Sequence, residues 1–402
     1  MAATLTTLMP ASPLAAMIPS RPSPRAARAP TTEASAALSP DQAWNAGAGA
    51  DGVIRWVANV AARLNTACIG GQVVPVTVLT GPPSRSSYVG SPHAAWISYP
   101  VAEALDRLSG WKRHLGAAAL NTLAVPFVAA QVVGRLGRAA VVANHLVSTN
   151  LHPTWTTADI AAATPDLTVR FPDRPLVLRN ICPAADPVLA DGLTAAGWRL
   201  IPARRIYLAD PREPALWKHN HLKRDVKLLG QTDVELVGPE ELTARDLPAL
   251  RTVFRQLFIA KHSALNPDYT ESFFRLCHER RFLDLYALRL DGRPVGVLGV
   301  YERNGWVTTP LIGYDTTLPQ ELGLYRRLMA LLFREAKRRG CRLHLSSGAG
   351  GFKAARGGIA HMEYTAVHAR HLAAPRRAAI AAFASAMDRA VPWVLERAER
   401  PR

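Results

Sequence analysis

Cysteine is scarce in this chain, and patterns of metal ligands or disulfides are missing. The four cysteines are far apart and form no C-x-x-C pair: Cys68, Cys182, Cys277 and Cys341. Their spacing excludes a disulfide framework and a cysteine zinc site, and predicts reduced thiols in a reducing compartment. The close histidine pairs, His219 with His221 and His368 with His371, have no acidic or thiol ligand at metal spacing. We therefore expect a cytoplasmic protein without a bound metal.

A secretory signal and a strong membrane span are also missing. Residues 1–17 lack a cationic start, and Pro10 and Pro13 interrupt their apolar run. Residues 115–134 contain no charged side chain, which is the pattern of a transmembrane helix. Their many Ala and Gly residues and the central Pro126 make transfer into lipid weakly favourable. We therefore expect a buried helix here and no membrane span.

Acidic side chains are outnumbered by basic ones. The chain has 48 Lys and Arg residues against 31 Asp and Glu, which gives a net charge of +17, and most of the excess follows residue 200. A positive field of this kind attracts polyanions, such as a phosphorylated carrier or tRNA. Solvated arginine faces without a ligand are the alternative interpretation.

The chain is long enough for two hydrophobic cores, and its composition changes along its length. Residues 1–50 are rich in Ala, Pro, Ser and Thr and predict a disordered tail. Alternating strand and helix patterns predict one α/β domain at 51–210 and a second at 242–402. Pro211 and Pro214 interrupt the pattern at the start of residues 211–241, which predict a linker followed by a basic helix.

Hydrophobic periodicity predicts the individual elements of both domains. For the first domain we expect helices at 52–65, 103–136, 156–163 and 187–196, and strands at 73–79, 94–99, 139–147, 175–181 and 198–208. After it we expect helices at 216–229, 242–261, 270–280 and 320–339, and strands at 283–290, 294–302, 305–314, 342–346 and 362–369. Asp291-Gly292 and Asn304-Gly305 predict tight hairpin turns.

The segment Gln320-Glu321-Leu322-Gly323-Leu324-Tyr325 lies where a strand passes into a helix. It resembles the pyrophosphate loop, Q/R-x-x-G-x-G/A, of the GNAT superfamily of acyltransferases. Backbone N–H groups at a helix start bind phosphate oxygens, and glycine permits close approach. The resemblance implies acyl-CoA as a co-substrate held by Gln320, Gly323 and Leu324, without a permanently bound cofactor. Tyr325 departs from the motif, because it replaces the final small residue.

A second resemblance concerns the two α/β units and the glycine-rich segment 345–358. Twin units of this kind look like the FemAB-like branch of the superfamily, some members of which use aminoacyl-tRNA in place of acyl-CoA. The segment is similar to the stretch after the fifth strand in that branch, where a lysine or arginine precedes the last hairpin. The resemblance covers 242–372 well and 51–210 only in outline. It implies two GNAT-like mixed-sheet α/β domains in tandem, preceded by the disordered tail.

The residues of this glycine-rich segment also predict a ligand site by themselves. A strand that ends at Ser346 and Ser347 is followed by glycines, Lys353 and Arg356. Hydroxyls, free N–H groups and cations thus gather at the carboxyl end of a strand, which is where ligands of α/β sheets bind. A flexible surface loop is the alternative, since glycine-rich loops are often only turns.

Amide formation needs a deprotonated amine, an activated acyl carbon beside it and a donor for the developing oxyanion. A nucleophilic residue is not required, so the absence of a G-x-S-x-G motif is no objection. The candidate bases are Glu302, His262 and Glu363, and the candidate proton donors are Tyr314 and Tyr364. His262 either lines a pocket or satisfies a helix-terminal carbonyl. Either tyrosine can be an ordinary core aromatic.

Polar side chains also follow two strands of the first domain. Ser148, Thr149 and Asn150 come after one strand, and Arg179 and Asn180 end another. Because strand ends converge at one edge of a sheet, these side chains can line an acceptor pocket. Capping of the next segment is the alternative role.

The sequence leaves three functions open. The first is N-acyl transfer from acyl-CoA to a small-molecule or peptide amine by direct attack. The second is amide formation from aminoacyl-tRNA, which the basic second half and Tyr325 favour. The third is a binding protein with a GNAT fold that has lost its chemistry. We expect neither a DNA partner nor a membrane span.

Overall fold

The computed structural model describes residues 38–48, 52–106 and 108–398. The strands are β1 (Ala62–Ile69), β2 (Gln72–Leu79), β3 (Ala140–Val142), β4 (Leu176–Ile181), β5 (Arg199–Ala209), β6 (Glu235–Val237), β7 (Asp284–Leu290), β8 (Arg293–Arg303), β9 (Trp306–Tyr314), β10 (Arg342–His344) and β11 (Ile359–His368). The helices are α1 (Pro40–Ala48), α2 (Tyr99–Asp106), α3 (Gly110–Val133), α4 (Thr157–Arg170), α5 (Pro187–Ala195), α6 (Asn220–Leu229), α7 (Leu247–Arg255), α8 (Glu271–Arg280), α9 (Leu324–Arg338), α10 (Gly350–Ala354) and α11 (Ala374–Ala398).

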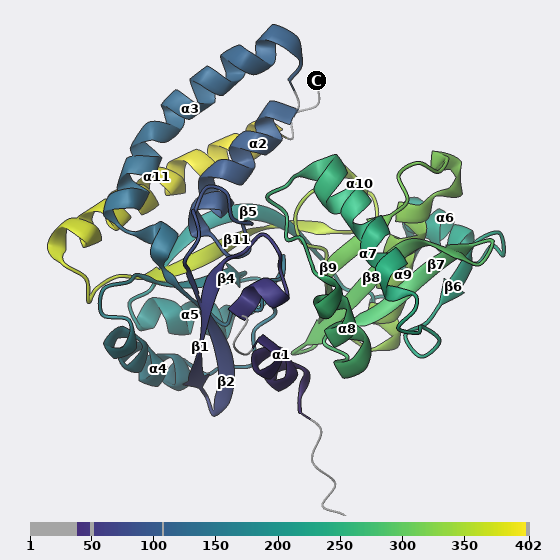
Figure 1. Cartoon of the computed structure of the whole chain (residues 1–402), viewed down its shortest axis with the longest axis horizontal. Helices are drawn as coiled ribbons and strands as arrows, with labels where there is room; N and C mark the ends of the chain where they lie inside the picture. Colours follow the sequence, from purple (N-terminus) through teal and green to yellow (C-terminus); the bar gives the residue numbers. More distant parts are fainter. Residues whose placement is uncertain (1–37, 49–51, 107, 399–402) are drawn as a thin grey trace, which may run out of the picture. The chain divides into compact units, whose positions relative to one another are not determined.

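The strands of this part of the chain form one mixed sheet. Their order is β1-β2-β3-β4-β11-β5-β10-β9-β8-β7-β6 (Figure 1). β3 is parallel to β4 and β9 is parallel to β10, whereas the other neighbours are antiparallel. The predicted α/β class with a mixed sheet is confirmed.

The last strand of the chain lies inside the first half of the sheet. β11 pairs on one side with β4 and on the other with β5, so that His368 is the Cα partner of Leu176 and Glu363 that of Arg204. β5 in turn pairs with β10. The sheet therefore continues across the boundary predicted near residue 210, and the division into two domains stays a prediction.

Alternating side chains of the first-half strands supply two separate cores. In β4, Leu176 and Leu178 pack with the apolar side chains of α4 and α5. Val177, which points to the opposite face, packs with Phe383 of α11 and Trp96. This period of two is what buries both faces of a strand. It explains why the first three residues of β4, Leu176 to Leu178, are all apolar.

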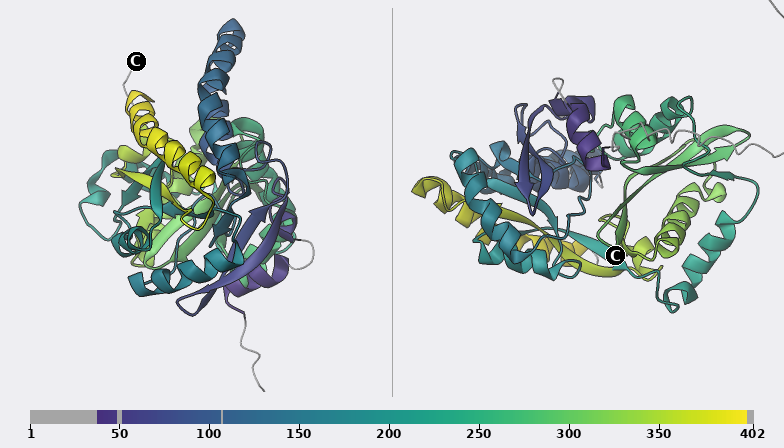
Figure 2. Two further views of the ribbon diagram at one scale, coloured as in Figure 1. Left: turned by 90° about the vertical axis from the view of Figure 1, so that its left-hand side faces the viewer. Right: turned by 90° about the horizontal axis from the view of Figure 1, so that it is seen from below.

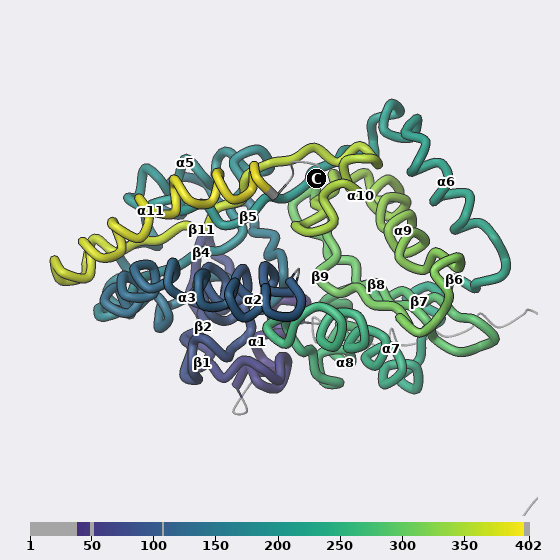
Figure 3. Tube along the Cα trace, turned by 90° about the horizontal axis from the view of Figure 1, so that it is seen from above, coloured from purple at the N-terminus to yellow at the C-terminus, as the bar shows by residue number. Residues whose placement is uncertain are grey.

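Helices cover both faces of the second-half strands as well. α9, with α6 outside it, lies on one side of β7 to β9, and α7 and α8 lie on the other (Figure 3). The helix α9 places Leu328, Leu331 and Leu332 on the sheet, which are the i, i+3 and i+4 positions of one helix face.

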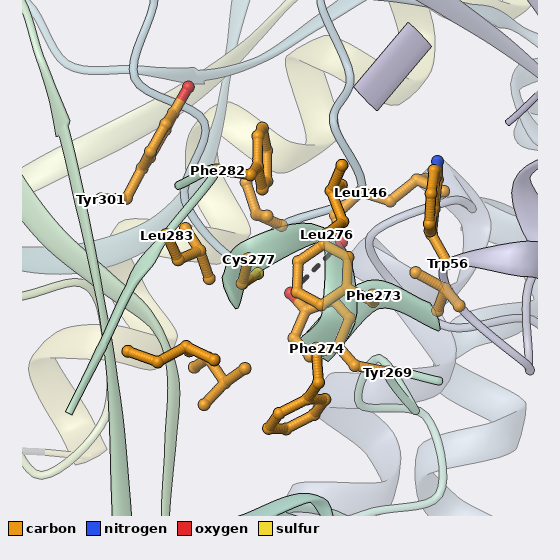
Figure 4. Close-up of a cluster of buried hydrophobic side chains, with 14 of the residues drawn as sticks. Trp56, Leu146, Tyr269, Phe273, Phe274, Leu276, Cys277, Phe282, Leu283 and Tyr301 are labelled. Carbon is orange, nitrogen blue, oxygen red and sulfur yellow. Dashed lines mark hydrogen bonds between the residues drawn. The ribbon is translucent and has the colours of Figure 1, made fainter. Parts of the chain in front are cut away.

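An aromatic cluster joins the α7–α8 layer to the first half of the chain. Tyr269 and Phe273 stack with ring centroids 4.2 Å apart, beside Trp56 and Phe282 (Figure 4). The Tyr269 hydroxyl donates a hydrogen bond of 3.3 Å to the carbonyl of Leu146, drawn as the dashed line in Figure 4. One core thus spans residues from both halves of the chain.

The helix expected to be buried at 115–134 is largely exposed. α3 lies beside α11 (Figures 1 and 2), and Gln131 is its one buried residue. Apolar side chains such as Trp111, 67% exposed, and Leu123, 68% exposed, face away from the protein. α3 and residues Ala374–Arg397 are each long and apolar enough to cross a bilayer by length and composition. The prediction of a buried helix was wrong.

The helix predicted at 52–65 is absent. A 3-10 turn, Gly52–Arg55, is followed by β1, which pairs along its whole length with β2. Gly70 and Gly71 close this hairpin with φ of 56° and 75°, as a two-residue hairpin turn requires. Cross-strand pairing therefore outweighs the helical spacing of the apolar residues before it.

Two predicted strands and the last residues of the predicted disordered tail also differ from the structure. Residues 94–99 are helical, because Trp96 packs against Phe383 and the chain continues into α2. The strand expected at 139–147 ends at Val142, where Ala143 takes a left-handed φ of 49°. α1 occupies residues 40–48 of the predicted tail, and residues 1–37 lie outside the described part of the chain.

Gly313 of β9 provides a test of how closely α7 approaches the sheet. A Cβ at Gly313 would lie 2.3 Å from the Cα of Phe254, a backbone atom that cannot turn away. We therefore expect Gly313→Ala to lower the free energy of unfolding by about 1–3 kcal/mol. Gly351→Ala, which meets no atom within 4 Å, is the matched control and should change it by less than about 0.5 kcal/mol. Equal urea-unfolding midpoints for the two variants would contradict this packing.

Candidate functional site

The strands β9 and β10 part near the centre of the sheet. They pair over three residues, the last pair being Thr308 with His344, and β9 then extends to Tyr314 while β10 ends. A register shift between β8 and β9 places a bulge at Thr309 and Pro310, and bulges often lie beside active sites. The Thr308 hydroxyl is fully buried and has no hydrogen-bond partner among the described residues. This position offers a buried hydroxyl and an irregular backbone to a ligand.

The chain turns sharply after β10. Ser346 and Ala349 both adopt a left-handed φ, of 58° and 46°, which is uncommon for residues other than glycine and is found most often at functional sites. The Ser346 N–H donates to Nδ1 of His344 over 3.1 Å, so the turn fixes the imidazole ring. A Cβ at Gly350 would lie 2.3 Å from the Tyr207 hydroxyl, which is why α10 begins with glycine.

An ion pair between two strands from opposite halves of the chain lies beside this turn. Arg204 of β5 donates from Nε to Oε1 of Glu363 of β11 over 2.6 Å, and Glu363 is only 1% exposed. Burial by itself raises the pKa of Glu363, but the charge of Arg204 and hydrogen bonds from His344 and Arg204 outweigh it and lower that pKa to about 2. Glu363 therefore stays ionised at neutral pH and is too weak a base for the role predicted for it.

Polar residues from the first half complete this arrangement. Asn180 donates to Glu363 Oε1 over 3.0 Å, and Thr149 donates to the Ser346 hydroxyl over 3.0 Å. Arg204 also donates to Thr149 Oγ1 over 3.1 Å. We call the whole set the central polar cluster: Thr149, Asn180, Arg204, His344, Ser346, Ser347, Lys353 and Glu363.

Lys353 of α10 supplies an amino group to the central polar cluster. Its Nζ donates to the carbonyl of Ser347 over 2.6 Å and to that of Ser346 over 3.4 Å. Lys353 is 4% exposed, and burial together with the charge of Arg204 lowers its pKa to about 7. A large fraction of its amino groups is therefore neutral near pH 7, which suits an acceptor of protons.

Aromatic side chains bound the central polar cluster on the side of the first half. Tyr88 and Tyr99 have ring centroids 4.9 Å apart, and burial raises the pKa of both hydroxyls. Arg179 donates to the carbonyl of Val89 over 3.0 Å, and burial lowers its pKa to about 10. Of the strand-end residues predicted to line a pocket, Thr149 and Asn180 belong to the cluster, whereas the Arg179 side chain donates to a backbone carbonyl.

The predicted pyrophosphate loop lies at the start of α9, beside α6. A 3-10 turn, Gln320–Leu322, precedes Gly323, whose φ of 58° separates it from the helix that begins at Leu324. Gly323 and Leu324 are buried, because a Cβ at Gly323 would lie 2.5 Å from Leu228 of α6. The Leu228 side chain therefore covers Gly323, and binding of a diphosphate by Gln320, Gly323 and Leu324 stays a prediction.

Arg356 lies with this loop rather than with Lys353. Its Nε donates to Oδ2 of Asp225 in α6 over 2.5 Å, and Arg326 of α9 donates to the other oxygen over 2.6 Å. Tyr325 stands between Tyr314 and the ring of Phe352, with centroid separations of 6.3 Å and 4.9 Å. The aromatic row of Tyr314, Tyr325 and Phe352 connects the start of α9 to α10. The predicted site residues therefore form two groups, which meet at α10.

Three of the candidate catalytic residues lie away from both groups. Glu302 accepts a hydrogen bond of 3.0 Å from Arg339, just after the far end of α9, and a helix of this length spans roughly 22 Å. His262 is exposed at the end of a π-helical turn, Gln256–His262. Tyr364 packs against the core of β1 to β4, which is its ordinary structural role. The structure does not bring these three side chains together with Lys353.

Sequence reasoning missed three members of the site, namely Arg204, His344 and Thr308. Arg204 left a usable signal, because it lies in the middle of a strand with many apolar residues, and an arginine that is buried needs a partner. His344 follows an apolar residue in a three-residue strand and looks like a core histidine. Thr308 is an ordinary β-branched strand residue, and nothing in the sequence indicates that its buried hydroxyl lacks a partner among the described residues.

Two strands of the sheet thus part beside a helix start and a cluster of buried polar groups. Residues 218–354 match the family model of the acetyltransferase (GNAT) domain. This match contains α6, the strands β6 to β10, the predicted loop and Lys353. The predicted resemblance to the GNAT superfamily is thus confirmed, and the family match covers these residues.

Several solved structures are similar to this chain at low identity. FemX has a TM-score of 0.42 and 8% identity, with 77% of this chain and 88% of FemX covered. L-PGS from Bacillus licheniformis has a TM-score of 0.38 and 15% identity, with 56% and 77% covered. A GCN5-related N-acetyltransferase from Kribbella flavida has a TM-score of 0.30 and 15% identity, with 57% and 80% covered. No curated protein matches the sequence.

The Arg204–Glu363 pair predicts a pH-dependent stability. Glu363→Gln leaves Arg204 buried without a countercharge, so we expect a loss of about 3–5 kcal/mol in the free energy of unfolding near pH 6. The folded pKa of Glu363 is depressed, so the unfolded chain binds more protons as the pH falls from about 4.5 to about 2. The wild type loses the contribution of Glu363 across this window, and its advantage over the variant shrinks.

Urea unfolding at about pH 6, 4 and 3 measures this difference. Glu321→Gln, at an exposed position of the predicted loop, is the matched control and should follow the wild type at each pH. An advantage of the wild type over Glu363→Gln that is constant with pH would refute the depressed pKa.

The lowered pKa of Lys353 predicts that the free energy of unfolding depends on pH in the alkaline range. Its folded pKa of about 7 lies below the value of about 10.4 in an unfolded chain. Between these values the unfolded state binds more protons, so the wild type gains stability as the pH rises from about 7 to about 10. Lys353→Met removes this term, and we expect its stability relative to the wild type to decline over the same range. Lys112→Met, at an exposed position of α3, should run parallel to the wild type.

Proposed function

We propose that the protein is an N-acyltransferase that moves an acyl group from acyl-CoA to an amine by direct attack. The observation that carries this proposal is the parting of β9 and β10 within a segment that matches a GNAT domain. Beyond Thr308, backbone groups of β9 on the side of β10 can pair with the amides of an extended carrier arm. The thioester then lies near the bulge at Thr309 and Pro310, between the start of α9 and the central polar cluster.

The chemistry follows from the groups around that position. The amine nitrogen attacks the thioester carbonyl carbon, the C–S bond breaks and the CoA thiolate leaves. The attacking nitrogen loses one proton, which the neutral amino group of Lys353 accepts. The Thr308 hydroxyl, which has no partner among the described residues, is available to the developing oxyanion. Lys353 and Thr308 are the catalytic residues of this proposal, and Arg204 and Glu363 are positioning residues.

Turnover of acyl-CoA with a panel of small amines and peptide amines tests the proposal. We expect kcat/KM to rise with pH up to about 7 and then to level off, because Lys353 must be neutral to accept a proton. Lys353→Met should lose roughly 100-fold or more in kcat/KM together with this inflection. Lys112→Met should retain both. An unchanged pH profile in Lys353→Met would reject Lys353 as the proton acceptor.

A second candidate is amide formation from aminoacyl-tRNA. It is supported by Leu228 and Tyr325, which crowd the predicted diphosphate position, and by the basic side chains of α6, namely Lys223, Arg224 and Lys227. The affinity for tRNA should then fall steeply with salt, whereas binding of CoA should depend on salt only weakly. Transfer from charged tRNA without transfer from acyl-CoA would replace the first proposal. Binding of a donor without any turnover would indicate a catalytically silent GNAT-fold protein.

A further inference from the structure

A basic cavity of about 710 Å³ lies at the far end of the first-half strands. It is formed by the start of β1, the end of β2, the carboxyl end of α3 and the segment between α4 and β4. Its size is typical of pockets that hold ligands as large as a nucleotide. Five arginines line it: Arg63, Arg135, Arg138, Arg170 and Arg174.

These five arginines have no carboxylate partner among the described residues. Arg138 donates to the carbonyls of Leu79 and Thr80, at 3.0 Å and 2.7 Å, and Arg174 donates to a backbone carbonyl over 2.9 Å. The one acidic residue of the lining, Asp173, has its carboxylate 3.7 Å from Arg376, outside the set. Guanidinium groups gathered without countercharges repel one another, and a bound anion removes that repulsion.

A buried amide at the same cavity points independently to a ligand. Gln131 of α3 is 1% exposed, and its Oε1 lies 2.8 Å from Nδ1 of His93, which donates to it. The Nε2 group of Gln131 has no hydrogen-bond partner among the described residues. A buried donor left without a partner costs roughly 1–3 kcal/mol, so its retention at an arginine-lined cavity is explained by an acceptor that arrives with a ligand.

The apolar part of the lining indicates an organic ligand rather than a bare ion. Val78, Leu79, Val132 and Phe171 face the same space as the arginines. Arginine matches phosphate oxygens with paired N–H groups, and several arginines fit more than one phosphate. We propose that this cavity binds a small organic molecule that carries a diphosphate, with the size of a nucleoside diphosphate. RNA is disfavoured, because backbone contacts need an extended basic surface rather than a cavity.

This binding site is separate from the central polar cluster. Arg174 precedes β4, whereas Asn180 lies near the other end of this strand, and six strand residues span roughly 20 Å. A ligand in the cavity therefore does not meet Lys353. The inference does not rest on the proposed acyl transfer, since it uses none of the residues of that proposal.

Calorimetric titration of the full chain with ADP, pyrophosphate and orthophosphate at constant ionic strength tests it. We expect ADP to bind more tightly than pyrophosphate, and pyrophosphate more tightly than orthophosphate. Arg63→Ala and Arg170→Ala should each weaken ADP binding roughly tenfold, and Gln131→Glu should weaken it further by adding a negative charge. Arg280→Ala removes the same charge from an exposed position of α8 and should bind as the wild type does.

Three results would overturn the inference. The first is the absence of ADP and pyrophosphate binding by the wild type, and the second is equal ADP binding by Arg63→Ala and Arg280→Ala. The third is salt-dependent binding of RNA that Arg63→Ala weakens, without binding of ADP, since this result would assign the arginines to nucleic acid. Lys353→Met should retain ADP binding. Loss of turnover in that variant together with intact ADP binding shows that the two sites fail independently.

Discussion

The ion pair of Arg204 with Glu363 is the interaction on which the rest of the site depends. A buried pair of this kind contributes little net stability, because the loss of hydration of two charges offsets their attraction. It persists here because the carboxylate is fully satisfied: Arg204 and Asn180 donate to Oε1, and Arg204 and His344 face Oε2. These donors come from β5, β4 and β10, while Glu363 belongs to β11. The pair therefore fixes four strands from both halves of the chain at one point.

The same pair sets the properties of Lys353. Arg204 is one of the two causes that lower the pKa of Lys353, and burial is the larger one. Because Glu363 compensates the charge of Arg204 rather than that of Lys353, the lysine has no acidic partner within the described part of the chain. Its amino group is instead held by the carbonyls of Ser346 and Ser347. The left-handed turn at Ser346 thus supplies the acceptors that keep a neutral lysine in place.

The sequence predicted those parts of the fold that depend on local patterns. The hairpins at Asp291-Gly292 and Asn304-Gly305 joined β7 to β8 and β8 to β9, because paired turn residues determine such connections locally. The cluster of Ser346, Ser347 and Lys353 was found for the same reason, since glycines mark the turn beside them. Arg204 was missed because its partner lies 159 residues away, on a strand that inserts between β4 and β5.

The burial of Gly323 in the predicted loop shows a second feature that a local sequence pattern cannot predict, namely which distant helix covers it. Gly323 begins a helix, as its place in the motif implies, but the motif says nothing of α6, which covers it through Leu228. α6 is held there by Asp225, which binds Arg326 of α9 and Arg356 near α10. The position of α6 over the loop and the position of α10, which carries Lys353, therefore depend on the same buried carboxylate.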